Sequence, residues 1–346
     1  MTDTRRSVYS GPAATATCPN CGSVQSGGLT ACAKCGAALP VVTASNITPG
    51  MIIDGKYEII GLLGVGGMGE VFKARHIHLN AFRCVKVMKR NLVADESFRN
   101  RFLREARVAT HVHHANLAVV HDFASLPDGS YYMVSEFVDG ITVRQWAGRY
   151  GRFGAELAIE IMLQVLSGLE HCHRKGLLHR DISADNIMIE FDDQGHPQAK
   201  IIDLGIAKIV SAPASDATQV GLFVGNPKYS SPEQLGHLPD GEEIDGRTDL
   251  YSLGVVVYEM LVGVPPFSSK TPHGYVIKHL TQPPIPLREA NPTLEWPTGL
   301  QEVIFKALEK DRKNRYADAR EFAKALRPFG SDQLVHWFPP EGAEPY

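Results

Sequence analysis

The chain has 346 residues, of which 44% are hydrophobic and 21% charged, with a formal net charge of −3. This length allows more than one hydrophobic core, because single cores stop growing near roughly 250–300 residues. The composition is typical of a globular protein, and the weak negative charge argues against general binding to nucleic acid or anionic membranes. No apolar run has the form of a signal peptide or of a membrane-spanning helix, so we expect a cytoplasmic protein.

The N-terminal region carries two Cys-x-x-Cys pairs. Residues 1–17 lack hydrophobic periodicity, so we expect them to be disordered. In residues 18–36, each cysteine pair is followed by glycine, and four thiolates from two tight turns make the tetrahedral site that Zn²⁺ prefers. The alternative is a redox-active or disulfide-bonded segment. The segment resembles a zinc ribbon, whose ligands here would be Cys18, Cys21, Cys32 and Cys35.

The ribbon has a single basic residue, Lys34, so we expect it to bind proteins in preference to nucleic acid. Residues 37–52 are rich in small residues and are expected to form a linker.

A glycine-rich turn follows. Strands are predicted from Tyr57 to Leu63 and from Glu70 to Ala74, with glycines concentrated between them in residues 64–69. The dinucleotide-binding fingerprint requires a helix after the glycines, and here a strand follows. Because glycine has no side chain, the backbone N–H groups of this turn could approach a polyphosphate, although a plain hairpin explains the pattern equally well.

Lys86 lies in an otherwise apolar strand, residues 83–88. An unpaired buried ammonium is costly, so Lys86 needs an anion. The helix predicted over about residues 95–112 places Glu105 beside its apolar face. We therefore predict that Lys86 pairs with Glu105 while contacting nucleotide phosphates. The alternative is an edge-strand lysine that reaches into solvent.

Two further strands, residues 118–123 and 131–136, complete a five-stranded first lobe with one helix. A long buried helix is then predicted from residue 155 to 173. It leads into the polar stretch 179–186, which apolar residues bracket, as expected of a loop held rigidly over chemistry. A hairpin then ends at Asp203. Together with Asn186, this residue offers hard oxygen ligands suited to Mg²⁺.

The remaining chain is predicted to be helical. A buried helix is expected over residues 248–261, and further helices are expected over residues 299–308 and 318–326. The tail from Ser331 contains Trp337; a frayed terminus is the simpler interpretation, and docking on the preceding domain or on a partner is the alternative.

Taken in order, these motifs resemble the bacterial serine/threonine branch of the eukaryotic-type protein kinases. The resemblance covers about residues 53–329 and implies an α+β bilobal fold: a β-rich N-lobe (53–136), a hinge (137–140) and a helical C-lobe (141–329), followed by a tail (330–346). The matching positions are Gly64–Val71, Lys86, Glu105, His179-Arg180-Asp181, Asn186, Asp203-Leu204-Gly205, Ser231-Pro232-Glu233, Asp249 and Arg315.

This resemblance implies transfer of the ATP γ-phosphate to serine or threonine of protein substrates, with Mg²⁺ or Mn²⁺. Asp181 would accept the hydroxyl proton, while Asn186 and Asp203 would bind the metal ion. Lys86, oriented by Glu105, would hold the α- and β-phosphates. The nucleotide would contact Leu63, Gly64, Val65, Gly66, Gly67, Met68, Gly69, Val71, Lys86, Glu136 and Val138.

Arg180, beside the proposed catalytic base, implies regulation by loop phosphorylation, because a phosphate could pair with its guanidinium. The candidate phosphorylation sites are Ser211, Ser215 and Thr218. The partners implied are protein substrates and regulatory proteins.

Three positions depart from the family pattern. Ser183 replaces a lysine that helps to neutralise the γ-phosphate, Asn226 replaces a threonine on the substrate side, and Leu204 replaces a phenylalanine. The first two motivate an alternative, a pseudokinase scaffold that binds nucleotide and signals by conformation.

Overall fold

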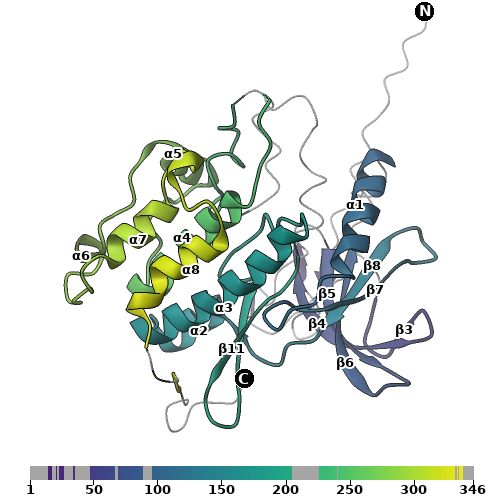
Figure 1. Cartoon of the computed structure of the whole chain (residues 1–346). Helices are drawn as coiled ribbons and strands as arrows, with labels where there is room; N and C mark the ends of the chain where they lie inside the picture. Colours follow the sequence, from purple (N-terminus) through teal and green to yellow (C-terminus); the bar gives the residue numbers. More distant parts are fainter. Residues whose placement is uncertain are drawn as a thin grey trace, which may run out of the picture. The chain divides into compact units, whose positions relative to one another are not determined.

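A computed structural model of the chain describes residues 15–17, 21, 23–26, 34–35, 47–66, 69–88, 96–204, 226–239, 241–331, 333 and 335–337 (Figure 1). The chain divides into two compact units: residues 1–90 with 125–132, and residues 91–124 with 133–346. This division differs from the predicted lobes, because residues 91–124 belong to the second unit.

The first unit is built on antiparallel strands. In spatial order these are β3 (Ile52–Ile53), β4 (Tyr57–Val65), β5 (Gly69–His76) and β6 (Ala81–Met88). Side chains alternate across the sheet, so that Ile59, Phe72 and Val85 are buried. The sheet continues with β8 (Tyr131–Glu136) and β7 (Val120–Ser125). It therefore has six strands where five were predicted, because the short β3 adds an edge.

This unit starts before the predicted boundary at residue 53. Ile47 is buried. The carbonyl of Met51 accepts a hydrogen bond from the N–H of Ile59 at 2.8 Å, and the N–H of Gly50 donates to the carbonyl of Ile59 at 2.8 Å. The linker prediction for residues 37–52 is therefore wrong at its C-terminal end, where an apolar side chain and backbone pairing attach the segment to β4.

A short hairpin lies near the N-terminus. β1 (Thr15–Thr17) pairs antiparallel with β2 (Val24–Ser26), in the register Thr15↔Ser26. The prediction of disorder through residue 17 is therefore wrong for Thr15–Thr17, where backbone pairing orders a stretch without apolar periodicity.

The second unit is mainly helical. Its helix α4 (Arg247–Val262) is buried along almost its whole length, as predicted for a core helix. The long α3 (Ala155–Arg174) contacts α4, α8 and β11, and Figure 1 shows these elements gathered together. The other helices are α1 (Glu96–Ala109), α2 (Val143–Tyr150), α5 (Pro272–Thr281), α6 (Leu287–Ala290), α7 (Leu300–Ala307) and α8 (Ala319–Leu326).

A small sheet accompanies these helices. Its strand order is β11 (Pro197–Ile201), β10 (Ile187–Phe191) and β9 (Ile141–Thr142), all antiparallel. The predicted hairpin over residues 187–202 is confirmed. Within the described part of the chain, no helix is long and apolar enough to cross a bilayer.

Helices α2 and α5 were not predicted, although both have recognisable starts. In α2, the Thr142 hydroxyl accepts from the N–H of Gln145 at 3.0 Å, and the Gln145 side chain accepts from the N–H of Thr142 at 2.8 Å. This reciprocal pair is a capping box. In α5, Thr271 caps the helix and Pro272 occupies its first turn, where a missing N–H costs nothing.

A buried ion pair joins two distant segments of the second unit. The guanidinium of Arg315 donates to Glu233 through Nη1 at 2.7 Å and Nη2 at 2.9 Å. The Arg315 side chain is 0% exposed and that of Glu233 is 3% exposed. Further donation from Arg315 to the carbonyls of Glu309 and Lys310 satisfies the buried guanidinium. Glu233 and Arg315 are two of the positions that match the family pattern.

We predict that Glu233→Gln lowers the free energy of unfolding by about 3–5 kcal/mol, because it leaves a buried guanidinium without its counter-charge. The measurement is urea unfolding at pH 7. Arg320→Ala is the control, since the Arg320–Glu170 pair at 3.1 Å involves an arginine side chain that is 73% exposed. Such a pair contributes about 0–1 kcal/mol. Equal effects of both substitutions would contradict the prediction.

Candidate active site

The glycine-rich turn joins β4 to β5 in the first unit. Gly64 pairs with Val71 and Val65 with Glu70, and the N–H of Gly66 donates to the carbonyl of Gly69 at 2.8 Å. The side chains of Leu63 and Val65 are exposed. Exposed apolar side chains beside an open turn fit a ligand that covers them.

The glycines of this turn have different environments. Among the described residues, a Cβ on Gly64 would meet no atom within 4 Å, and one on Gly66 would come no closer than 3.8 Å to any atom. On Gly69 it would meet the carbonyl oxygen of Val87 at 2.0 Å. Among the described glycines of the turn, packing therefore requires glycine at Gly69 alone, and the space beside Gly64 and Gly66 is open to a ligand.

Lys86 lies on β6 opposite Val71 of the neighbouring strand. It is partly buried, as predicted for a lysine in an apolar strand. Lys86 belongs to the first unit, whereas Glu105, on α1, belongs to the second. Their ion pair stays a prediction.

A buried carboxylate fixes the polar stretch that precedes β10. Asp249 of α4 is 0% exposed and accepts from the backbone N–H of His179 at 2.9 Å and of Arg180 at 2.7 Å. It also contacts the ring of His173 at 2.8 Å. Burial opposes ionisation of Asp249, but these hydrogen bonds outweigh it and lower the pKa of the carboxyl.

His179 links this stretch to the strand end before Asp203. Its Nδ1 lies 3.2 Å from the N–H of Asp181, and its Nε2 lies 3.3 Å from the carbonyl of Ile202. Since Nδ1 must accept the first bond, Nε2 carries the proton and donates the second. A neutral imidazole thus holds the two polar segments together.

Asn186 completes this connection. Its side-chain amide donates to the carbonyl of Asp181 at 2.8 Å, and its own carbonyl accepts from the N–H of Ile202 at 2.9 Å. The amide nitrogen is therefore engaged, so that Oδ1 is the amide atom suited to a cation. The structure brings Asp181, Asn186 and Asp203 onto two adjoining, hydrogen-bonded segments.

The backbone at this site is constrained. Arg180 has φ +60° and Asp203 has φ +59°, in the left-handed region that residues other than glycine seldom adopt. Such conformations persist where the surroundings dictate them, and they concentrate at functional sites.

Arg180 combines burial with incomplete pairing. Its Nε is buried and has no hydrogen-bond partner among the residues that the structure describes. Burial lowers the pKa of its guanidinium, and the carboxylates of Asp249 and Glu105 oppose this shift only in part. A cation in this state has room for a further anion.

The segment after Glu136 is tied to the second unit. The N–H of Glu136 donates to the carbonyl of Val119 at 2.8 Å, and its carboxylate pairs with Lys200. Val138 is buried. Nucleobase contacts at Glu136 and Val138 stay a prediction.

A charged cluster beside the loop was missed from the sequence. Arg144 of α2 donates from Nε to both carboxylate oxygens of Asp185 at 3.0 Å, and its Nη1 lies 3.5 Å from Glu259. Glu259 also accepts from Lys228 at 2.6 Å and from the hydroxyl of Tyr229 at 2.7 Å. The signal that could have found Arg144 is the capping box of α2, which places this residue in the first turn of a helix.

Several predicted site residues lie outside the described part of the chain. These are Gly67 and Met68 of the glycine-rich turn, Cys18 and Cys32 of the ribbon, and Ser211, Ser215 and Thr218. Among the described residues, no group of three or more His, Cys, Asp or Glu side chains is arranged to hold a metal ion.

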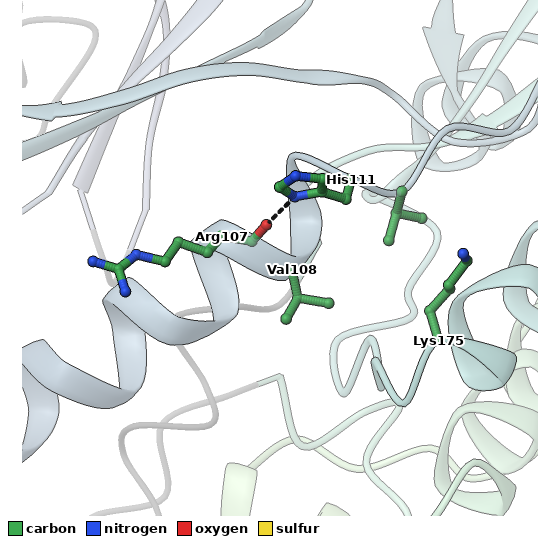
Figure 2. Close-up of a pocket in the computed structure, with 5 residues that line it drawn as sticks. Arg107, Val108, His111 and Lys175 are labelled. Carbon is green, nitrogen blue, oxygen red and sulfur yellow. Dashed lines mark hydrogen bonds between the residues drawn. The ribbon is translucent and has the colours of Figure 1, made fainter.

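A pocket of about 330 Å³ in the second unit contains none of the predicted site residues. Arg107, Val108, His111, Val112 and Lys175 line it, where α1 ends near the end of α3, as Figure 2 shows. The ring of His111 contacts the carbonyl of Arg107 at 2.7 Å. Three of the five lining residues, Arg107, His111 and Lys175, are exposed. The pocket therefore opens at the surface, and no residue of the polar loop lines it.

Comparison with known proteins assigns the family. Residues 57–326 match the family described as protein kinase domain. The chain belongs to this family.

Curated relatives of this kinase domain are named serine/threonine-protein kinases. Pkn3 of Myxococcus xanthus is 35% identical over 280 residues, which cover 80% of this chain and 50% of pkn3. PknB of Mycobacterium tuberculosis is 37% identical over 282 residues, which cover 81% of this chain and 43% of PknB. The chain thus spans half or less of the length of the curated relatives that it matches.

Solved kinase structures are similar to it. The PknI kinase domain of M. tuberculosis superposes with a TM-score of 0.63 at 29% identity, covering 82% of this chain and all of that one. Rad53 in complex with AMP-PNP gives a TM-score of 0.64 at 25% identity, covering 79% of this chain and 65% of that one.

All three departures from the kinase pattern lie in the described part of the chain. Asn226 is exposed, and its Oδ1 accepts from the N–H of Lys228 at 3.2 Å. Ser183 is 3% exposed, and its carbonyl accepts from the N–H of Asn186 at 3.1 Å, within the turn of the loop. Leu204 is buried, which agrees with retained apolar packing at this position.

A buried histidine supports the chain that follows Asn226. The Nε2 of His279 lies 3.0 Å from the carbonyl of Lys228, and its Nδ1 lies 2.9 Å from the hydroxyl of Tyr251. In the neutral ring, Nε2 donates and Nδ1 accepts, so both nitrogens are satisfied. Burial, with a smaller contribution from nearby Lys310, lowers the pKa of His279 to about 4.

We predict a loss of stability on acidification. The unfolded chain protonates His279 near the ordinary histidine pKa of 6.5 and the folded chain only near 4, so the unfolded state binds more protons between these values. The contribution is fully present above pH 6.5 and is lost as pH falls toward 4, by about 3 kcal/mol in total. Urea unfolding measured at several pH values across this range should show that the free energy of unfolding depends less steeply on pH in His279→Gln than in the wild type.

The control is His273→Gln, which removes an exposed histidine from the same helix. An unchanged pH slope in His279→Gln, or equal flattening in both variants, would contradict the assignment.

Proposed function

We propose that the chain is an ATP-dependent serine/threonine protein kinase. The observation that carries this proposal is the hydrogen-bonded arrangement of Asp181, Asn186 and the strand end before Asp203. Membership of the protein kinase domain family supports it, as do the curated relatives named serine/threonine-protein kinases and the solved relative in complex with AMP-PNP.

In this proposal, Asp181 accepts the proton of the substrate hydroxyl as the hydroxyl oxygen bonds to the γ-phosphorus of ATP. The bond from the γ-phosphorus to the β–γ bridging oxygen breaks, and ADP leaves. Asn186 and Asp203 hold Mg²⁺ through their side-chain oxygens, which are the hard ligands that this ion prefers. When bound, Mg²⁺ neutralises charge on the transferred phosphoryl group. Lys86, oriented by Glu105, binds the α- and β-phosphates.

Nucleotide contacts are proposed separately for the β4–β5 turn of the first unit and for Glu136 and Val138 of the second. Backbone N–H groups near Gly64 and Gly66 contact the phosphates, which the open space in front of these glycines supports. The exposed Leu63 side chain lies over the base, whose polar edge meets the backbone of Glu136 and Val138. The remaining nucleotide contacts are proposed at Val65, Gly67, Met68, Gly69 and Val71.

We further propose that phosphorylation between Leu204 and Asn226 regulates the kinase. The buried Nε of Arg180, which has no hydrogen-bond partner among the described residues, supports this, because a phosphate could accept a hydrogen bond from it. The candidate sites are Ser211, Ser215 and Thr218.

We predict that Asp181→Asn abolishes transfer of phosphate from labelled ATP-Mg²⁺ to the chain itself and to a generic basic protein, while nucleotide binding is retained. Removing the base and its charge should lower the rate by at least about 10²-fold. Mass spectrometry of the wild-type product would identify the phosphorylated residues. Glu295→Gln, which removes an exposed carboxylate, is the matched control.

No transfer by the wild-type chain above the Asp181→Asn level, with nucleotide still bound, would overturn the enzyme proposal. That outcome would leave the pseudokinase scaffold as the explanation.

A second proposal concerns the N-terminus, where Cys18, Cys21, Cys32 and Cys35 bind Zn²⁺. Their spacing supports this. So does the β1–β2 pairing, which brings together the two ends of the turn that contains the first cysteine pair. A segment this small has little core, so metal binding would be what folds it.

We predict one zinc ion per purified chain, lost in Cys18→Ser and in Cys32→Ser but kept in Cys84→Ser, which alters a cysteine of β6 outside the two pairs. Elemental analysis measures the zinc content. Zinc at the same level in all variants, or in none, would count against the ribbon.

A further inference from the structure

The C-terminal tail returns to the second unit and inserts an aromatic side chain. The ring of Trp337 lies 4.3 Å from that of Trp146, and 5.0 Å from those of Tyr150 and Phe191, measured between centroids. Trp146 and Tyr150 belong to α2, and Phe191 ends β10. Aromatic rings at such separations attract one another beyond their burial alone. The tail is therefore docked at Trp337, which excludes the frayed terminus at this residue.

The backbone of the tail is also held. The N–H of Trp337 donates to the carbonyl of Gly195 at 2.9 Å, and the ring of His336 contacts the carbonyl of Gln194 at 3.0 Å. These carbonyls lie in the turn between β10 and β11. Asp192 organises this turn by accepting from the N–H groups of Gln194 and His196, each at 2.9 Å. Two elements, α2 and this turn, thus form a receptor for Trp337.

Both elements lead to the proposed catalytic loop. In the first turn of α2, the N–H of Arg144 donates to the carbonyl of Ala184 at 2.9 Å. The Arg144 side chain donates to the carboxylate of Asp185. Strand β10 begins at Ile187, directly after Asn186. A segment that holds α2 against the end of β10 therefore also holds the two supports of this loop.

The docked arrangement costs free energy, because it includes buried polar atoms that lack a hydrogen-bond partner among the described residues. The Nε1 of Trp146, the hydroxyl of Tyr150 and the Nε2 of His196 are buried without a hydrogen-bond partner in the described part of the chain. Release of Trp337 would let water reach such groups. Aromatic attraction is thus opposed by desolvation, as expected of a contact that can open.

We propose that residues 335–337 form a C-terminal latch in which Trp337 positions α2 and, through Arg144, the loop that bears Asp181. Trp337 is a positioning residue, since it acts on the loop through other side chains. The proposal rests on the proposed kinase function, and it adds to that function a segment beyond the family match, which ends at residue 326.

The test compares the full chain with Trp337→Ala, Trp337→Phe and Gln333→Ala. Gln333 is exposed in the same tail and serves as the matched control. Hydrogen–deuterium exchange of residues 143–150 and 192–196 reports docking independently of catalysis. Trp337→Ala should raise exchange there and lower kcat about tenfold with KM for ATP unchanged, because a loosened loop misplaces the base. Trp337→Phe should keep the exchange and kcat close to those of the wild type, and Gln333→Ala should change neither.

A double-mutant cycle tests the route. In an Arg144→Ala background, the further change Trp337→Ala should lower kcat by less than about twofold, because the connection is already broken. Full additivity would overturn the route through Arg144. Faster exchange with unchanged kcat would reduce the tail to a local stabiliser, and unchanged exchange would show that Trp337 does not dock in solution. Either result overturns the latch.

Failure of the proposed function is separable. If the wild-type chain transfers no phosphate above the Asp181→Asn level, the kinase proposal fails and the positioning role fails with it. The exchange data would still show whether the tail docks.

Discussion

The carboxylate of Asp249 is the constraint on which the rest of the second unit depends. It lies in a helix buried almost throughout, and it receives two successive backbone N–H groups from His179 and Arg180. A buried carboxylate is tolerated only when its hydrogen bonds are complete, and here the donors are the loop itself. The energetic requirement of the core thus becomes a geometric requirement on the loop, and it holds Arg180 in a left-handed conformation that it would otherwise avoid.

The same logic extends from the loop to its neighbours. Gln234 donates to the carbonyl of Arg180 at 2.8 Å, so the segment around Glu233 is attached to the loop from one side. Arg144 attaches it to α2 from the other side. His279 and Glu259 fix Lys228 and Tyr229, between these two attachments. The polar loop is therefore held by side chains from several helices, each bond satisfying a group that would be costly to bury alone.

The sequence was most informative where periodicity and burial coincide. The helices at residues 155–173 and 248–261, the strands of the first unit and the β10–β11 hairpin followed from apolar spacing, and the structure confirms them. Local pattern could not reveal which partner a charged residue would choose across about 40 or more positions, as Arg144 does with Asp185. Nor could it decide between a frayed and a docked Trp337, since a short tail with three aromatic residues and three prolines shows no helical or strand periodicity. The short α2 and α5 were missed, although the Thr142 capping box and the Thr271-Pro272 start are signals that the sequence contains.

The three described glycines of the β4–β5 turn differ in how well they would tolerate substitution by a larger residue. Gly69 faces the carbonyl oxygen of Val87 across the sheet, so any side chain there must push two strands apart. Gly64 and Gly66 meet no such obstacle among the described residues. Substitutions at Gly64 and Gly66 can therefore change which ligand the turn accommodates at little cost to folding. A substitution at Gly69 cannot serve this purpose, since it would disrupt the pairing of the strands before it changed ligand binding.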